Sequence, residues 1–274
     1  MKSIVNIIIS LVCFCIVAVF TLFIWMRFIE PNIIKIEKLN FNFESFEGKF
    51  SALHLTDLHS KSFGRKEKEI LKIIDKTQPD FIFLTGDIVD WITKDLDSCY
   101  IFWQELAQKK QGRVFAVLGN HEHRNPQFLK IVSLLSQSEI KVLDNEWKEI
   151  KVDEASFYLI GVDDPHLGFD DLGKAMISLP ENSIKILLAH SPEIFRKTEN
   201  QGIDIILTGH THGCQINIPF ICDKIIPLKY DKQYRAGLFE KNGTFLYVNR
   251  GIGETFLPLR LNAFPEATLL KINF

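Results

Sequence analysis

Five short apolar segments of this chain each end in polar residues, and this recurrence constrains the fold more than any other feature. Each segment is followed directly by a carboxylate, an amide or an imidazole. The five polar clusters are Asp57-Leu58-His59, Gly86-Asp87, Gly119-Asn120-His121-Glu122, His190 and Gly209-His210-Thr211-His212. In open α/β sheets, binding sites form outside the carboxyl ends of the strands. The recurrence therefore predicts one site built from five strand ends.

Helical patterns separate the first three of these strands. Residues 66–76 place their isoleucines and leucine at helical spacing with charges opposite, and residues 96–109 and 127–137 are similar. Alternation of strand and helix implies right-handed crossovers and a largely parallel sheet. After residue 140, short strands separated by turns predominate. We therefore expect an α/β fold of two stacked mixed β-sheets flanked by helices.

The amino-terminal segment is predicted to anchor the chain in a membrane. Ile4 to Met26 is an apolar run without charge, long enough for a helix to span a bilayer. Trp25 and Arg27 stand at its end, where interfacial residues are common. A cleaved signal peptide is the alternative, but the run is long for one and no small-x-small cleavage site precedes Arg27.

The anchor divides the chain into three expected parts. They are a transmembrane anchor over residues 1–27, a stalk and first strand region over residues 28–48, and a catalytic domain over residues 49–274. Basic residues on the two sides of the anchor almost balance, and they favour a cytoplasmic catalytic domain only slightly.

Composition narrows the classes of partner. The formal net charge is −2, so no basic field indicates a nucleic-acid partner. Cys13 and Cys15 lie in the apolar run, and Cys99, Cys214 and Cys222 show no CxxC spacing. We therefore expect no disulfide framework, a pattern that leans towards a reducing compartment.

Each polar residue taken singly has an ordinary explanation. Asp57 or Asp87 could cap a helix or make a turn, Asn120 could make a turn, and His190 could be a core histidine. Recurrence at five strand ends favours a shared site instead. Mixed imidazole, amide and carboxylate ligands suit manganese, iron, zinc or nickel. A two-ion hydrolase holds its ions roughly 3.5–4 Å apart, and a carboxylate that bridges both ions would serve that arrangement.

Together the five motifs closely resemble those of the calcineurin-like metallophosphoesterase superfamily, which read D-x-H, G-D, G-N-H-[DE], H and G-H-x-H. The resemblance implies two divalent ions, with manganese the first choice. It assigns to the first ion Asp57, His59 and His212, to both ions Asp87, and to the second ion Asn120, His190 and His210. It implies in-line attack of a metal-activated water on phosphorus, with His121 near the leaving-group oxygen.

Other stretches, such as residues 160–165 and 249–253, resemble a membrane-associated bacterial branch that includes UDP-2,3-diacylglucosamine pyrophosphatases. This resemblance implies a bacterial cell membrane, a lipid-linked substrate and cleavage to UMP and a lipid monophosphate in lipid A synthesis. Arg250 and Arg260 are candidates for contacts to substrate phosphates, because guanidinium groups match phosphate oxygens. The alternative for both is a surface salt bridge. His54, His123 and His166 match no motif, and we expect core or surface roles for them.

One departure from the branch pattern follows the double-histidine motif. The branch usually reads G-H-T-H-G-G-Q, and Cys214 replaces the second glycine. If the backbone there needs a positive φ, a cysteine would be strained. The apolar segment 216–228 that follows either dips into the membrane interface or forms a core loop.

Two other functions remain open at this point. The first is an outward-facing envelope phosphodiesterase or phosphatase acting on another substrate. The second, from a different class, is a catalytically inactive scaffold, against which the intact ligand set argues. The sequence does not indicate an oligomeric state.

Overall fold

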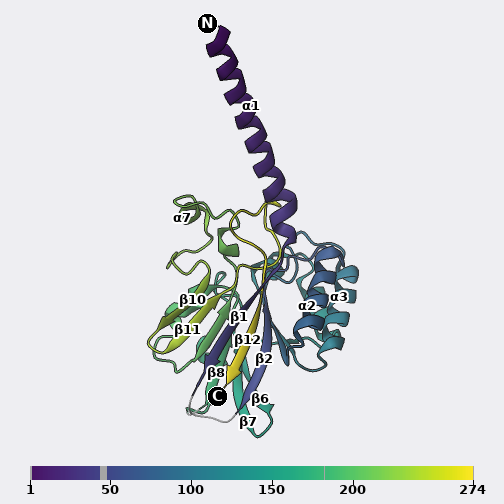
Figure 1. Cartoon of the computed structure of the whole chain (residues 1–274). Coiled ribbons are helices and arrows are strands. Elements are labelled where there is room, and N and C mark those ends of the chain that lie inside the picture. The colour runs from purple at the N-terminus through teal and green to yellow at the C-terminus, as the bar shows by residue number, and fades with distance from the viewer. Residues whose placement is uncertain (1, 44–47, 182, 274) are drawn as a thin grey trace.

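Two six-stranded mixed β-sheets pack face to face in the computed structural model, with helices on their outer faces (Figure 1). The structure describes residues 2–43, 48–181 and 183–273. The predicted pair of mixed sheets flanked by helices is thereby confirmed.

Each sheet combines parallel and antiparallel pairs. The strands of the first sheet, in spatial order, are β1 (Lys35–Asn42), β12 (Glu266–Asn273), β2 (Lys49–Leu55), β3 (Phe81–Thr85), β4 (Val114–Val117) and β5 (Lys141–Val142). Those of the second are β10 (Gly237–Lys241), β11 (Thr244–Val248), β9 (Ile205–Thr208), β8 (Ile184–Leu188), β7 (Ala155–Gly161) and β6 (Glu146–Val152).

The helices are mostly short, apart from the first three along the chain. They are α1 (Lys2–Ile24), α2 (Arg65–Thr77), α3 (Leu96–Lys109), α4 (Asn120–Arg124), α5 (Phe128–Gln137), α6 (Leu172–Ala175) and α7 (Cys222–Ile225). A π-helical turn (Trp25–Ile29) and 3₁₀ turns (Glu30–Asn32, Pro192–Lys197 and His212–Cys214) complete the set.

Phenylalanines fill the space between the sheets. Phe81, Phe83 and Phe115 of the first sheet are buried there beside Phe157 of the second. Phe50 stacks on Phe157 across the layers, with ring centroids 4.4 Å apart and planes 12° apart. Such aromatic pairs hold the two sheets in a fixed relation, so that polar residues at the ends of both sheets can form one site.

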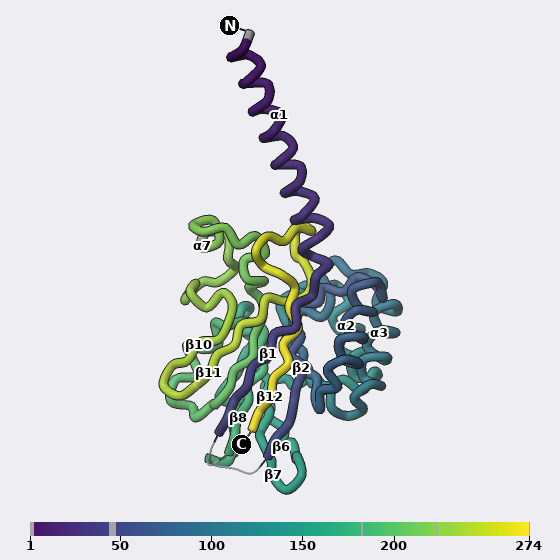
Figure 2. Tube along the Cα trace, viewed as in Figure 1, coloured from purple at the N-terminus to yellow at the C-terminus, as the bar shows by residue number. Residues whose placement is uncertain are grey.

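Strand direction decides where that site lies relative to the amino terminus. β1 runs parallel to β12, whereas β2 runs antiparallel to β12, and β3 and β4 follow β2. The carboxyl ends of β2, β3 and β4 therefore lie at the same end of the sheet as the start of β1. Helix α1 enters the domain at that end (Figure 2).

Helix α1 projects away from the domain and continues through the following turns as one apolar helical segment, Ser3–Asn32 (Figure 1). Its length and composition suffice to cross a membrane, a test that a signal sequence also passes. The predicted stalk contributes edge strand β1 to the first sheet, and residues 44–47 of that stalk lie outside the described residues.

His54, on β2, is a core histidine, and its burial makes the free energy of unfolding depend on pH. It is fully buried, its Nε2 lies 2.8 Å from Thr85 Oγ1, and burial lowers its pKa to about 3. An unfolded histidine has a pKa of about 6.5. Between these values the unfolded chain binds a proton that the folded chain does not, so stability falls as pH falls.

In the parent chain, His54 should lower the free energy of unfolding by about 1.4 kcal/mol for each pH unit below about pH 6. We therefore expect His54→Gln to remove this pH dependence. Chemical unfolding of both chains at about pH 7 and about pH 5 measures it. The difference in free energy of unfolding between the parent and the variant should be smaller at about pH 5 than at about pH 7. An equal difference at both pH values would contradict the assignment of His54 as a buried neutral histidine.

Candidate active site

The five polar clusters meet at one end of the two sheets. Strands β2, β3 and β4 contribute from the first sheet, and β8 and β9 contribute from the second. The side chains so gathered, all buried, are those of Asp57, His59, Asp87, Asn120, His121, His190, His210 and His212. All eight residues predicted as metal or catalytic groups thus lie together.

The backbone reaches this arrangement through left-handed conformations. Asp57, His59, Asp87, His210 and His212 have φ between 43° and 70°. Such values are uncommon for residues other than glycine and cluster at functional sites. The turn before Asp87 needs a glycine as well, because a Cβ on Gly86 would lie 2.7 Å from His190 Nδ1.

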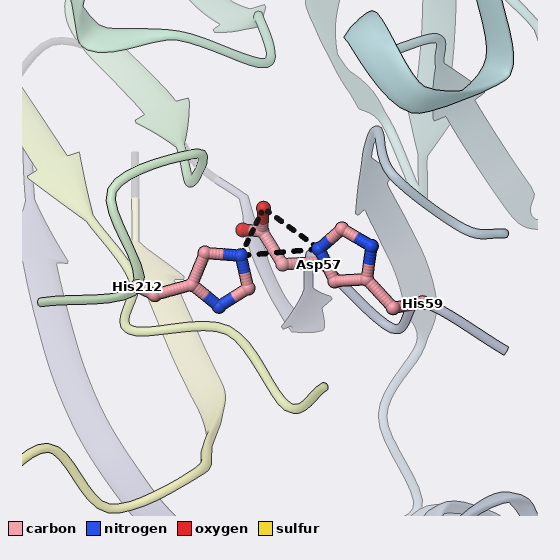
Figure 3. Close-up of side chains that lie close together, drawn as sticks. All are labelled: Asp57, His59 and His212. Atoms are coloured by element: carbon pink, nitrogen blue, oxygen red, sulfur yellow. Dashed lines mark hydrogen bonds and ion pairs between the residues drawn. The ribbon is translucent and has the colours of Figure 1, made fainter. Parts of the chain in front are cut away.

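The first group of candidate ligands comprises Asp57, His59 and His212, which point towards one another (Figure 3). His212 Nε2 lies 3.1 Å from His59 Nε2 and 3.4 Å from Asp57 Oδ1. Asp57 Oδ1 is buried and has no hydrogen-bond partner among the described residues. Three ligand atoms therefore face a common point.

The second group comprises Asp87, His190 and His210, with Asn120 beside them. His190 Nε2 lies 3.4 Å from Asp87 Oδ2, 3.2 Å from Asn120 Oδ1 and 3.0 Å from His210 Nδ1. The same Asp87 Oδ2 lies 3.7 Å from His59 Nε2 of the first group. Asp87 thus stands between the two groups, as the resemblance implies for a bridging carboxylate.

Three of these histidines are in the neutral form, which is the form of imidazole that binds a cation. Burial lowers the pKa of His59, His210 and His212 well below the ordinary value, so these rings are neutral. His190 Nδ1 lies 2.9 Å from the Thr85 carbonyl, and His210 Nε2 lies 3.3 Å from the Pro227 carbonyl. Donation to these carbonyls leaves the other nitrogen of each ring free for a ligand. The donor set therefore fits divalent cations.

His121 has a partner that the sequence analysis did not identify. Asp90 Oδ1 lies 3.6 Å from His121 Nδ1, and His121 Nε2 lies 3.8 Å from Asp87 Oδ2. Burial alone would lower the pKa of His121, but Asp87 and Asp90 outweigh it and raise that pKa. The two carboxylates thus favour the protonated form of His121 beside the second group. No motif in the sequence marks Asp90, because the contact forms only when the turns after β3 and β4 come together.

Glu122 holds two of the turns together. Its carboxylate accepts hydrogen bonds from the backbone N–H groups of Asp87, Val89 and Gly119, at 2.8 to 2.9 Å. Burial raises the pKa of Glu122 to about 7. It is therefore a positioning residue for the turns after β3 and β4.

The two arginines predicted to contact substrate lie outside the cavity, although Arg260 Nη2 is 3.5 Å from His212 Nδ1. Arg260 is fully buried, and its guanidinium donates to the carbonyls of residues 250, 251, 253 and 263. Arg250 forms an ion pair with Glu266. Neither lines the cavity over the candidate ligands, whereas Arg124 does. The arrangement gives Arg260 a structural role, and Arg124 is the guanidinium placed to meet a phosphate.

Cys214 and Cys222 form a disulfide, with Cα atoms 5.5 Å apart. The expectation that these cysteines form no disulfide is therefore wrong, because the intervening loop folds back on itself. Cys214 has a φ of 70°, so the position usually held by glycine does need a left-handed backbone. The disulfide fixes this residue two positions after His212.

A cavity of about 300 Å³ opens over the candidate ligands. Asp87, Asn120, His121, His210 and His212 line it. His166, for which no site role was expected, lines it as well, and its ring lies 4.5 Å from that of His210. The remaining wall includes the apolar side chains of Ile216, Ile225, Pro227, Phe256 and Leu257. The cavity thus has the candidate ligands on one wall and a group of apolar side chains on another.

Comparison with known proteins agrees with this geometry. The family model described as "Calcineurin-like phosphoesterase" matches residues 50–214. The chain is 30% identical to the uncharacterized metallophosphoesterase YkuE of Bacillus subtilis, over 90% of this chain and 88% of YkuE. It is 28% identical to the phosphodiesterase YaeI of Escherichia coli, over 90% of this chain and 92% of YaeI. The superfamily resemblance is confirmed.

Solved structures show the same fold. The crystal structure of TT1561 of Thermus thermophilus matches 74% of this chain and 90% of that protein, with a TM-score of 0.52 and 12% sequence identity.

Asp87→Asn should disrupt both ligand groups, because its carboxylate stands between them. We expect loss of bound metal and a fall of about 100-fold or more in hydrolysis of an aryl phosphodiester. Elemental analysis and initial rates measure the two effects. Asp204→Asn, the same change at the opposite end of β9, should leave both unchanged. Parent-like turnover by a metal-loaded Asp87→Asn chain would refute the role assigned to Asp87.

Proposed function

Because the chain belongs to the calcineurin-like phosphoesterase family, whose members are metal-dependent phosphoester hydrolases, we propose that it cleaves a phosphodiester or pyrophosphate bond in a lipid-linked substrate at a bacterial membrane. The observation that carries this proposal is the cavity. It has the candidate metal ligands on one wall and apolar side chains on another, as a substrate with a phosphate and a hydrocarbon part requires.

The chain's own residues supply binding, orientation and a proton. Two divalent cations, when bound by the two groups, would activate water and neutralise phosphoryl oxygens. Manganese is our first choice for this mixed N/O ligand set, with zinc, iron and nickel as the other candidates. His121 lies beside Asp87, which raises its pKa, and would donate a proton to the leaving-group oxygen. Arg124 would bind a second phosphate on the cavity wall.

We further propose that α1 is an uncleaved single-pass anchor. Its apolar segment is long enough to cross a bilayer, and its most apolar stretch of 18 residues is not buried against the domain. A lipid-linked substrate diffuses in the membrane plane. Tethering the enzyme to the same membrane raises the effective concentration of the substrate at the active site.

UDP-2,3-diacylglucosamine is the substrate that we propose to test first, because the motifs around residues 160–165 and 249–253 resemble those of its pyrophosphatases. Its cleavage would serve lipid A synthesis. The full chain, purified with manganese, should release UMP and a lipid monophosphate from this substrate in mixed micelles, and chromatography of the products measures this. His121→Ala should lower the rate by about 100-fold or more. An inert lipid substrate, with the aryl phosphodiester still cleaved, would rule out this assignment and keep the hydrolase.

The disulfide favours a second candidate. Disulfides persist in oxidising compartments and are rare in the cytosol, and Cys214–Cys222 lies in the catalytic domain. An outward-facing enzyme would meet another phosphorylated lipid, because UDP-sugars are cytosolic.

A reporter at the carboxyl terminus, active only outside the cytoplasm, together with maleimide trapping of Cys214 and Cys222 in cells, separates the candidates. For the outward-facing enzyme we expect an active reporter and cysteines that resist alkylation until reduced. Cys99, a free buried cysteine, is the internal control because it should react only after unfolding, with or without reductant. An inactive reporter and freely alkylated thiols would eliminate this candidate.

A further inference from the structure

We infer that two loop tips beside the cavity, Phe220-Ile221 and Phe256-Leu257, insert into the interfacial layer of the bilayer that holds α1. We call these four residues the apolar rim. The inference rests on the anchor included in the proposed function, and it adds a second membrane contact whose place is set by the fold. Through this contact the cavity would open at the lipid surface rather than towards bulk water.

Strand directions place the rim at the anchor's end of the domain. The carboxyl ends of β2, β3 and β4 lie where β1 begins, directly after the segment of α1. In Figure 1 the loop carrying α7 and the loop before β12 lie at this same end, beside the base of α1. A bilayer crossed by α1 would therefore face both loops.

Hydrogen bonds fix the second loop to the base of the helix. The backbone N–H of Arg260 donates to the Met26 carbonyl at 2.9 Å, and that of Ala263 donates to Glu30 Oε1 at 2.8 Å. Glu30 is itself buried and accepts a bond from Trp25 Nε1 at 2.8 Å. Phe256 lies only four residues before Arg260. The anchor and this part of the rim therefore have a defined relation, unlike that of a domain on a flexible tether.

Gln215 joins the two loops to each other. Its side-chain amide donates to the carbonyls of Thr255 and Leu257, at 3.1 and 2.6 Å, and its Oε1 accepts from the Thr255 N–H at 2.9 Å. The Cys214–Cys222 disulfide closes the other loop immediately beside it. Both loop tips are thus held by residues that directly follow His212.

The rim side chains are displayed to solvent. Phe256 is 90% exposed and Phe220 85% exposed, with Ile221 and Leu257 about half exposed. Both phenylalanines have a positive φ, 53° and 66°, which is unfavourable for a bulky side chain. Neither exposure nor backbone strain stabilises the isolated domain, whereas insertion into a lipid interface would bury these side chains.

The rim also continues into the cavity. Phe256 and Leu257 line its wall, as does Ile225 near the other loop. A hydrocarbon chain leaving the bilayer would therefore meet apolar side chains until its phosphate reached His121 and Arg124. Continuity with the anchor is what favours a lipid surface over a protein as the occupant of this face.

Quenching of tryptophan fluorescence by brominated acyl chains tests the inference. The full chain is reconstituted into vesicles of phosphatidylcholine and phosphatidylglycerol, with and without bromine on the acyl chains. Phe220→Trp and Phe256→Trp each add one reporter at the rim. Glu154→Trp is the matched control, because it adds one at the exposed β6–β7 turn, at the opposite end of the domain.

We expect each rim variant to lose more fluorescence to bromine than the parent chain, and the control to lose no more than the parent. Rim variants quenched only as much as the parent would overturn the inference and would leave a protein partner as the occupant. A chain that does not sediment with the vesicles would overturn it too. The readout needs neither metal nor turnover, so failure of the proposed hydrolysis would be seen separately.

Discussion

The burial of two carboxylates, Asp57 and Asp87, is the constraint on which the rest of the site depends. Their side chains are buried, and an ionised group in such a place is costly unless it is paired or hydrogen-bonded. Backbone N–H groups supply some of these hydrogen bonds. That of His210 donates to Asp57 Oδ2 at 2.9 Å, and that of His121 donates to Asp87 Oδ1 at 2.8 Å. The left-handed turns after the strands bring these N–H groups and the imidazoles to the two carboxylates.

Much of this site could be predicted from sequence because its parts follow directly after buried strands. Residues 184–188, in the apolar segment that precedes His190, are apolar apart from Lys185 and form β8, and the expected helix over residues 96–109 is α3. Parallel strands then bring their carboxyl ends to one edge without further information. Strand order alone does not predict which ligands form each group, because His210 and His212 lie in different groups although only one residue separates them.

What escaped prediction depends on partners that are distant in the sequence. In the sequence Arg260 is indistinguishable from a surface arginine. In the fold, its guanidinium donates hydrogen bonds to carbonyls of the turn at residues 250–253. Cys214 and Cys222 pair only because the loop between them folds back. Asp90 is an ordinary turn residue until β4 delivers His121 beside it. In each case local spacing carries no signal, since the partner is chosen by packing of the whole domain.

The pairing of β1 with β12 has a mechanical consequence. β1 follows the apolar segment of α1 and pairs with β12 at eight register positions, and β12 in turn pairs with β2 (Figure 2). A pull along α1 therefore loads the β1–β12 ladder in shear, with all its hydrogen bonds sharing the force. The order of synthesis matters as well, because β12 follows β1 to β11 in the sequence. Until β12 has been synthesised, β1 has no partner strand in the first sheet.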